Sequence, residues 1–95
     1  MIRHIVFFSA KGKNDLADVL AGLHLLKGIP HALRLEVEPN IREDALSDAV
    51  DIVVYGEFAD TAALAAYKAH PLYQKSIDLV RPLRELRVAA DINSG

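Results

Sequence analysis

Residues 50–71 read VDIVVYGEFADTAALAAYKAHP, and this stretch decides the fold. The apolar, β-branched run at 50–58 predicts a buried strand. Asp60 is placed to cap a helix that reaches Ala69, because its carboxylate can accept hydrogen bonds from free backbone N–H groups. Pro71 ends that helix and opens another short one, since proline is favoured in a first helical turn. We therefore expect a strand followed by two short helices.

Upstream of this stretch, the sequence predicts one strand and one longer helix. Residues 2–9 form the strand, because they are β-branched, aromatic and apolar nearly throughout. Asn14 or Asp15 caps the helix, and Gly28 ends it. An apolar stripe recurs along this helix every three or four residues and would face the core; it consists of Leu16, Val19, Leu20, Leu23 and Leu26.

The remaining segments complete the order β-α-β-β-α-β. Apolar and charged residues alternate at 33–38, which predicts a half-buried strand, and the polar stretch 39–49 is a surface loop. A closing strand spans 83–92, with one face formed by Leu86, Val88 and Ala90. This order is that of the ferredoxin-like α+β fold, a four-stranded antiparallel sheet with both helices on one face. Residues 1–95 form a single domain.

Composition excludes several classes of function. The net charge of −2 and the lack of a Lys/Arg cluster argue against a nucleic-acid partner. No stretch is long and apolar enough to span a membrane, and the absence of cysteine excludes disulfides and Cys-based zinc sites. The four histidines show no metal-ligand spacing, and no phosphate-binding loop is present. We expect a cytoplasmic protein with no metal or cofactor.

The two central strands predict a partner. Residues 2–9 and 50–58 are apolar on both faces, whereas the helices can cover only one. An uncovered sheet would exceed the few hundred Å² of apolar patch that a soluble monomer usually exposes. We therefore expect a homodimer in which two sheets pack face to face.

The chain also resembles a known family over essentially its whole length. The matching stretches are 1–8, 51–60, 64–71 and 80–83, followed by the closing strand. Together they resemble the stress-responsive α/β-barrel domain (Dabb) family. The resemblance implies a dimeric α/β barrel. It implies little about activity, because most members have no assigned reaction and some plant members are stress-induced oligomers.

One plant relative is a polyketide cyclase that closes a ring by aldol condensation without a cofactor. The resemblance places its catalytic tyrosine at Tyr67 of this chain. Its catalytic histidine falls at Tyr73, so the catalytic pair is incomplete here. His4 and His70 match family positions and are candidate contacts in the pocket.

The alternation of side chains along the first strand indicates how a site could form. His4, Val6 and Phe8 share one face, and if that face meets the helices, His4 lies beside Tyr67. A neutral imidazole could then accept a proton while the phenol donates a hydrogen bond to a carbonyl or enolate oxygen. Simpler roles are also open: His4 and Tyr67 could fix a helix against the sheet, and His70 could cap the next helix.

We thus expect a cleft between sheet and helices. Its candidate catalytic residues are Tyr67, His70 and His4, and its candidate ligand contacts are Val6, Phe8, Val54, Leu64 and Tyr73. The leading hypothesis is a protein of unassigned activity that binds a small hydrophobic or aromatic molecule. One alternative is a cofactor-free enzyme acting on a polyketide-like or enolisable carbonyl compound; another is a purely structural oligomer.

Overall fold

The computed structural model describes residues 1–94 and has the expected ferredoxin-like order of elements. The helices and strands are β1 (Ile2–Ala10), α1 (Leu16–His24), β2 (Arg34–Pro39), β3 (Ile52–Phe58), α2 (Thr61–Ala69), α3 (Pro71–Val80) and β4 (Arg84–Asn93). Short 3-10 turns, Lys13–Asp15 and Leu25–Gly28, flank α1. The four strands form one antiparallel sheet in the order β2-β3-β1-β4.

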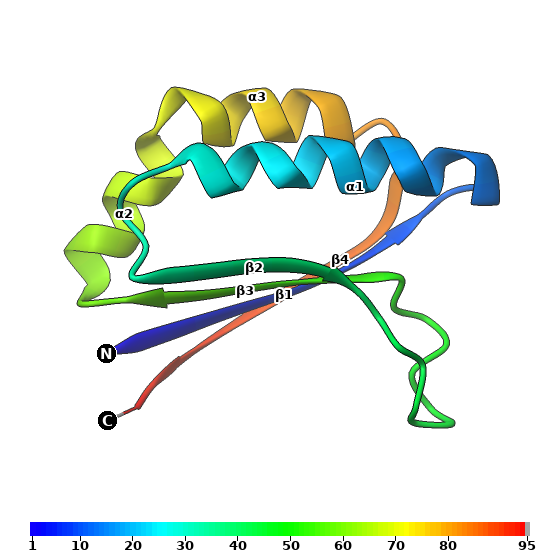
Figure 1. Ribbon diagram of the computed structural model, residues 1–95, viewed down its shortest axis with the longest axis horizontal. Helices are drawn as coiled ribbons and strands as arrows, with labels where there is room; N and C mark the ends of the chain where they lie inside the picture. Colours follow the sequence, from blue (N-terminus) through cyan, green and yellow to red (C-terminus); the bar gives the residue numbers. More distant parts are fainter. Residues whose placement is uncertain (95) are drawn as a thin grey trace.

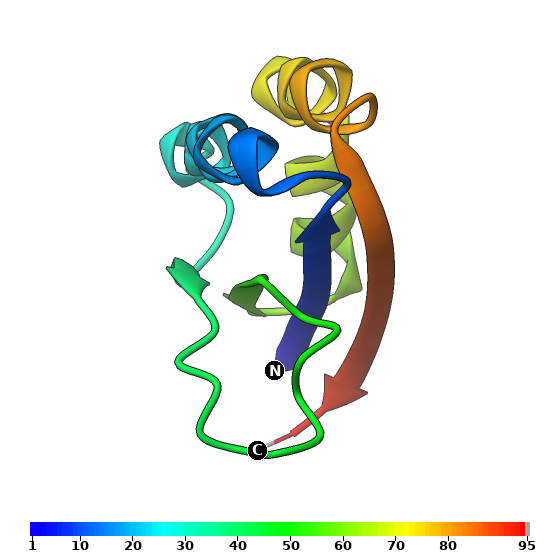
Figure 2. The same ribbon diagram turned by 90° about the vertical axis from the view of Figure 1, so that its right-hand side faces the viewer.

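The structure has two layers. Helices α1 and α3 lie side by side across one face of the sheet, and α2 joins the end of β3 to the start of α3 (Figure 1). A view turned by 90° shows both long helices on the same side of the strands (Figure 2). The core fills the space between the layers and contains three of the five residues predicted as the apolar helix stripe, namely Val19, Leu23 and Leu26. The other two, Leu16 and Leu20, are partly buried against it.

The two predicted helix-capping residues differ in what their side chains do. Asp60 Oδ1 accepts a hydrogen bond from the Ala63 N–H at 2.8 Å, which confirms the predicted cap of α2. Asp15 is the residue before α1, but its side chain makes no capping hydrogen bond. The preceding 3-10 turn explains this difference, because it holds Asp15 in a helical backbone conformation (φ −88°, ψ −13°), whereas a capping residue such as Asp60 is extended.

The predicted third strand starts two residues later than the sequence suggests. β3 begins at Ile52, so Val50 and Asp51 lie outside it. The Asp51 N–H donates to the Phe8 carbonyl at 2.8 Å, and the Asp51 carboxylate accepts from the Ala10 N–H at 2.9 Å. These bonds tie the loop to the end of β1 instead of extending β3.

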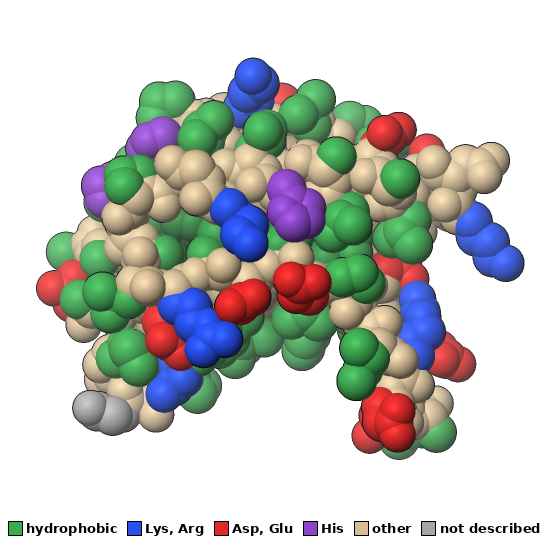
Figure 3. All heavy atoms as spheres, viewed as in Figure 1, with side chains coloured by type: hydrophobic (Ala, Val, Ile, Leu, Met, Phe, Trp, Pro, Cys, Tyr) green, Lys and Arg blue, Asp and Glu red, His purple; other side chains and the backbone are tan. Residues whose placement is uncertain are grey.

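The other face of the sheet has no covering helix. Phe7 is 38% exposed there, and Val88 and Ile92 are each 50% exposed. Strand alternation and register bring apolar side chains together on this outer face; they are Ile5, Phe7, Val53, Tyr55, Leu86, Val88, Ala90 and Ile92. Figure 3 shows hydrophobic side chains below a row of charged ones along the sheet. The chain therefore covers only one of its two apolar faces.

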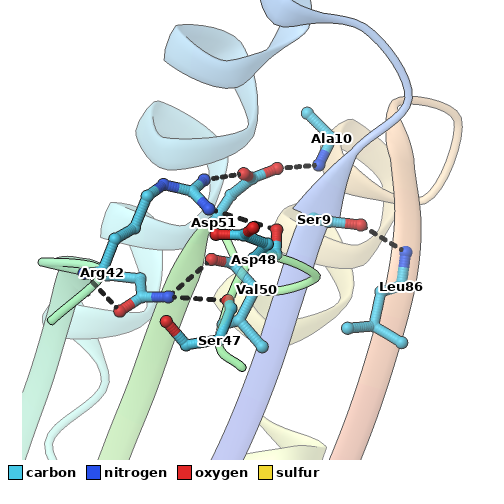
Figure 4. A network of polar contacts seen from close by, with 9 residues as sticks. Ser9, Ala10, Arg42, Ser47, Asp48, Val50, Asp51 and Leu86 are labelled. Atoms are coloured by element: carbon cyan, nitrogen blue, oxygen red, sulfur yellow. Dashed lines mark hydrogen bonds and ion pairs between the residues drawn. The ribbon is translucent and has the colours of Figure 1, made fainter. Parts of the chain in front are cut away.

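The loop between β2 and β3 projects beyond the sheet, away from the helices (Figure 1). Asn40 Nδ2 donates to the carbonyls of Ser47 and Val50 at 3.1 and 2.8 Å, and Arg42 pairs with Asp51 (Figure 4). Arg42 has a φ of 58°, which the Asn40 side chain supports by accepting the Arg42 N–H at 2.9 Å. These bonds give the predicted polar loop a defined conformation.

Candidate functional site

A cavity of about 240 Å³ lies between the sheet and the helices. Its floor comes from β1, β3 and β4, and its roof and walls come from α1, η2 (Leu25–Gly28), α2 and α3. Six of the eight side chains predicted for the site line it: His4, Val6, Phe8, Val54, Tyr67 and Tyr73. The structure thus brings together residues that are far apart in the sequence.

The pleat of β1 explains why the floor is largely apolar. His4, Val6 and Phe8 alternate with outward-facing residues and are only 2%, 3% and 6% exposed. Val54 joins them because it lies directly opposite Val6 on β3. Leu23 and Leu26 complete the apolar lining from above, with Ile77 and Val80 of α3.

His4 is the polar group that β1 contributes to this floor. Asp91 lies directly opposite it on β4, and the His4 Nδ1 and Asp91 Oδ1 atoms are 2.5 Å apart. Burial lowers the pKa of His4 below its ordinary value of 6.5, and this effect outweighs the attraction of Asp91. Lys68 and Arg87 lower the His4 pKa further. We therefore assign a neutral imidazole that donates Nδ1–H to Asp91 and leaves Nε2 as an acceptor.

Tyr67 supplies the second polar group, from the last turn of α2. Its ring is 1% exposed and packs against Phe58, Tyr73 and His4, with ring centroids 4.9, 5.3 and 6.3 Å away. Burial raises the pKa of Tyr67, and Tyr73 raises it further, so the phenol stays protonated at neutral pH.

The Tyr67 hydroxyl has no hydrogen-bond partner among residues 1–94. Every fully buried side-chain polar atom in that part of the chain does have a partner, so this hydroxyl is not fully buried. The same holds for Nε2 of His4, whose ring bonds only through Nδ1. Both residues line the cavity, so these two atoms are candidates for hydrogen bonds to a molecule bound there. An acceptor and a donor are thus available to a molecule bound there.

The remaining two predicted residues do not line the cavity. His70 Nδ1 accepts the Leu72 N–H at 3.1 Å and caps α3, and its ring faces His31 at a centroid distance of 6.1 Å. Leu64 is 8% exposed and belongs to the core. Within the described part of the chain, no group of three or more His, Cys, Asp or Glu side chains could hold a metal ion.

Sequence reasoning missed the charged side of the site. Asp91 bonds His4, and Arg81, Arg84 and Arg87 line the cavity beside α3 and β4. Strand alternation could have found two of these residues, because positions 87 and 91 face opposite to the predicted apolar face of the last strand. Their proximity to His4 depends on the register between β1 and β4, which alternation alone does not supply.

The fold and the cavity define a ferredoxin-like α+β protein with an amphipathic pocket between its layers. A family model described as Stress responsive A/B Barrel Domain (Dabb) matches residues 2–94. The chain therefore belongs to the stress-responsive α/β-barrel domain family, which confirms the resemblance seen in the sequence. No helix formed by residues 1–94 is both long and apolar enough to cross a membrane.

Solved structures show the same fold at low sequence identity. A dimeric ferredoxin-like protein of unknown function from Jannaschia sp. CCS1 is 23% identical, with 98% of each chain covered and a TM-score of 0.83. A Dabb family protein from Mesorhizobium loti is 24% identical, with 98% of this chain and 95% of that one covered and a TM-score of 0.81. An antibiotic biosynthesis monooxygenase is 17% identical, with 100% and 99% covered and a TM-score of 0.79. A comparison with curated proteins found no match.

Proposed function

We propose that this chain is a homodimeric protein that binds a small hydrophobic or aromatic molecule between its sheet and its helices. The cavity of about 240 Å³ carries this proposal. Binding sites for small molecules are typically concave and apolar, with a few polar groups that orient the ligand. The aliphatic walls, the two tyrosine rings and the polar groups of His4 and Tyr67 fit that description.

The outer face of the sheet supports the homodimer. Its exposed side chains include Phe7, Val88 and Ile92. Charged residues of the edge strand β2 lie on one side of this face, next to β3; they are Arg34, Glu36 and Glu38. An apolar centre with a polar rim is the usual anatomy of a protein interface. Dimeric relatives with this fold, such as the Jannaschia protein, add support.

A blocked cavity tests the binding proposal. Ile77 lines the cavity from α3 and is partly buried, so Ile77→Trp should fill part of the space. We expect a small library of aromatic compounds to raise the melting temperature of the wild type, since a ligand that binds only the folded state stabilises it. That shift should disappear in Ile77→Trp.

The matched control is Leu79→Trp, on the same helix but 49% exposed and outside the cavity lining. It should keep the ligand-induced shift of the wild type. If no compound shifts the wild type, or if both variants respond alike, the binding proposal is wrong and a purely structural oligomer becomes the better description.

The His4–Asp91 pair favours a second candidate function, cofactor-free proton transfer on an enolisable carbonyl compound. Asp91 orients the imidazole, leaving Nε2 to take a proton from an acidic C–H bond, while Tyr67 donates a hydrogen bond to the enolate oxygen. His70 is a weaker candidate for the base, because its Nδ1 is engaged in capping α3.

Hydrogen–deuterium exchange tests this chemistry. Benzoylacetone in D₂O should exchange its acidic C–H faster with the protein present, as followed by proton NMR. His4→Gln and Tyr67→Phe should each slow the exchange at least tenfold, whereas His24→Gln, an exposed histidine outside the cavity, should not. Exchange at the buffer rate with the wild type would rule out proton transfer on this class of substrate.

A further inference from the structure

An irregularity in β4 places two arginines on the inner face of the sheet. Phe8 pairs with Arg87, and Ala10 pairs with Arg84. Between these two pairs β1 moves on by two residues and β4 by three, so β4 contains one extra residue, a β-bulge. Without the extra residue, Arg84 and Arg87 would point to opposite faces, because side chains alternate along a strand. The bulge turns both toward the cavity, which is a common role of bulges beside binding sites.

The bulge is held by a specific hydrogen bond. Between the two pairs, the Leu86 N–H donates to Ser9 Oγ at 3.0 Å (Figure 4). This side-chain acceptor satisfies a backbone donor at the point where the regular ladder is interrupted. The direction of Arg84 is therefore built into the backbone and does not depend on a flexible rotamer alone.

A third arginine, Arg81, lies at the C-terminal end of α3 and lines the same cavity. None of these guanidinium groups takes part in an ion pair or a side-chain hydrogen bond within residues 1–94; the ion pairs there use Arg3, His4, Arg34 and Arg42. The cavity thus has an apolar interior and a rim of positive charge that no acidic side chain of the described residues pairs with.

The three guanidinium groups repel one another. Loss of solvent lowers the pKa of Arg84, and repulsion from Arg87 and Arg81 lowers it further. Arg81 has a structural reason for its position, since a cation at a helix C-terminus complements the helix dipole. Within residues 1–94, Arg84 and Arg87 have no such stabilising interaction, and a bound anion would relieve their repulsion.

We propose that the cavity binds aromatic monocarboxylates, with the ring between the apolar walls and the carboxylate on Arg84 and Arg87. A guanidinium group matches a carboxylate with two parallel hydrogen bonds, which makes arginine suited to this task. The cavity of about 240 Å³ equals roughly eight water volumes of ~30 Å³ each, so one or two fused rings are the expected size. This inference rests on the proposed binding function and specifies its ligand class.

A pair of matched ligands tests the charge requirement. 2-Naphthoate and 2-naphthalenemethanol share the ring system and differ in carrying a carboxylate or a neutral hydroxymethyl group. Isothermal titration calorimetry at pH 7 should show that the wild type binds the naphthoate at least tenfold more tightly. Raising the salt concentration should weaken the naphthoate alone, because salt screens exposed charge pairs.

The variant Arg84→Gln/Arg87→Gln should reduce naphthoate affinity at least tenfold and leave the alcohol unchanged. Lys13→Gln and Lys27→Gln combined remove the same number of charges from exposed positions outside the cavity lining and serve as the control. Circular dichroism establishes that each variant is folded, and the comparison of the two ligands on the wild type stands even if the arginine variant does not fold.

The outcomes separate this inference from the binding function. If both ligands bind the wild type equally well, or if the arginine variant loses both equally, the carboxylate assignment is wrong while binding stands. If neither ligand binds, aromatic monocarboxylates are not the ligand class and the carboxylate assignment is wrong. Failure of the broader aromatic library would in addition overturn the binding function itself.

Discussion

The two faces of β1 have similar composition and opposite surroundings. On the inner face, Val6 and Phe8 are 3% and 6% exposed under the helices. On the outer face, Ile5 is partly buried and Phe7 is 38% exposed, with no helix above them. The same strand therefore supplies the core of the subunit with one face and an apolar surface with the other. The difference is what the proposed homodimer would explain, because a second copy of the chain would cover the outer face.

β4 gives the comparison a second part. Its outer face is apolar and includes Val88 and Ile92, whereas its inner face carries Arg87 and Asp91. The inner surface of the sheet thus changes from apolar at β1 and β3 to charged at β4. The candidate site lies at this boundary, where a ligand can meet both an apolar wall and a charged group.

The largest expected effects come from placing the same charge on the two faces of β1. Val6→Asp buries a carboxylate with no partner in the core, and we expect a loss of more than ~4 kcal/mol in the free energy of unfolding. Such a chain should be unfolded at 25 °C by circular dichroism. Phe7→Asp should leave the subunit folded and produce a monomer at micromolar concentration in light scattering, because it charges the proposed interface.

The contrast between the two neighbours is the informative result. If Phe7→Asp also unfolds, the outer face is part of the subunit's own folding core. If it stays dimeric, the dimer does not use this face. Glu38→Gln on β2 at the charged margin is the control and should change neither property by much, since it is exposed and lies away from the apolar centre.

The fold could be read from the sequence because each element carries a local signal. Apolar runs mark the strands, and Asp60 marks the start of α2 with the hydrogen bond that its side chain makes. The start of β3 was misplaced by two residues because Val50 and Asp51 are as compatible with a strand as with a loop end. Tertiary bonds of Asp51 to Phe8 and Ala10 decide between them.

Only part of the candidate site could be predicted from the sequence, because the rest depends on tertiary contacts. His4, Val6 and Phe8 follow from alternation along one strand, and the family resemblance identified Tyr67. Asp91 requires the register of two strands that are far apart in the sequence. Arg84 requires the bulge as well, since regular alternation would turn its side chain away from the cavity.

A smaller effect is expected at Gly56, which lies opposite His4 on the inner side of β3. A Cβ atom there would lie 2.7 Å from Cε2 of Phe58 and 3.2 Å from Cδ1 of Leu35. The missing side chain thus lets the Phe58 ring lie across the strand, where it packs on Tyr67 and His4. Gly56→Ala should displace this ring and lower the free energy of unfolding by roughly 1–3 kcal/mol.

Urea denaturation measures this loss, and Gly12→Ala provides the control. Gly12 is exposed, and its added Cβ would meet only the flexible Asp15 carboxylate at 3.3 Å. If Gly56→Ala costs no more than Gly12→Ala, the Phe58 ring has room to move and the inner face is less tightly packed around His4 than the structure indicates.

The smallest effect concerns the pH dependence of stability and tests the buried state of His4. Its pKa is lowered from 6.5 in the folded chain, mainly by burial. Above about pH 6.5 the imidazole is neutral in both folded and unfolded chains and adds no slope. As the pH falls below 6.5, the unfolded chain takes up the proton first, so the free energy of unfolding decreases until the pH passes the lowered pKa. One proton gives a slope of at most ~1.4 kcal/mol per pH unit.

Urea denaturation between pH 7 and 5, at one protein concentration, should show this slope in the wild type and a shallower one in His4→Gln. His24→Gln removes an exposed histidine instead and is the matched control. Equal slopes for the wild type and His4→Gln would mean that His4 titrates as it does in the unfolded chain, and the neutral imidazole assigned to the cavity floor would be wrong.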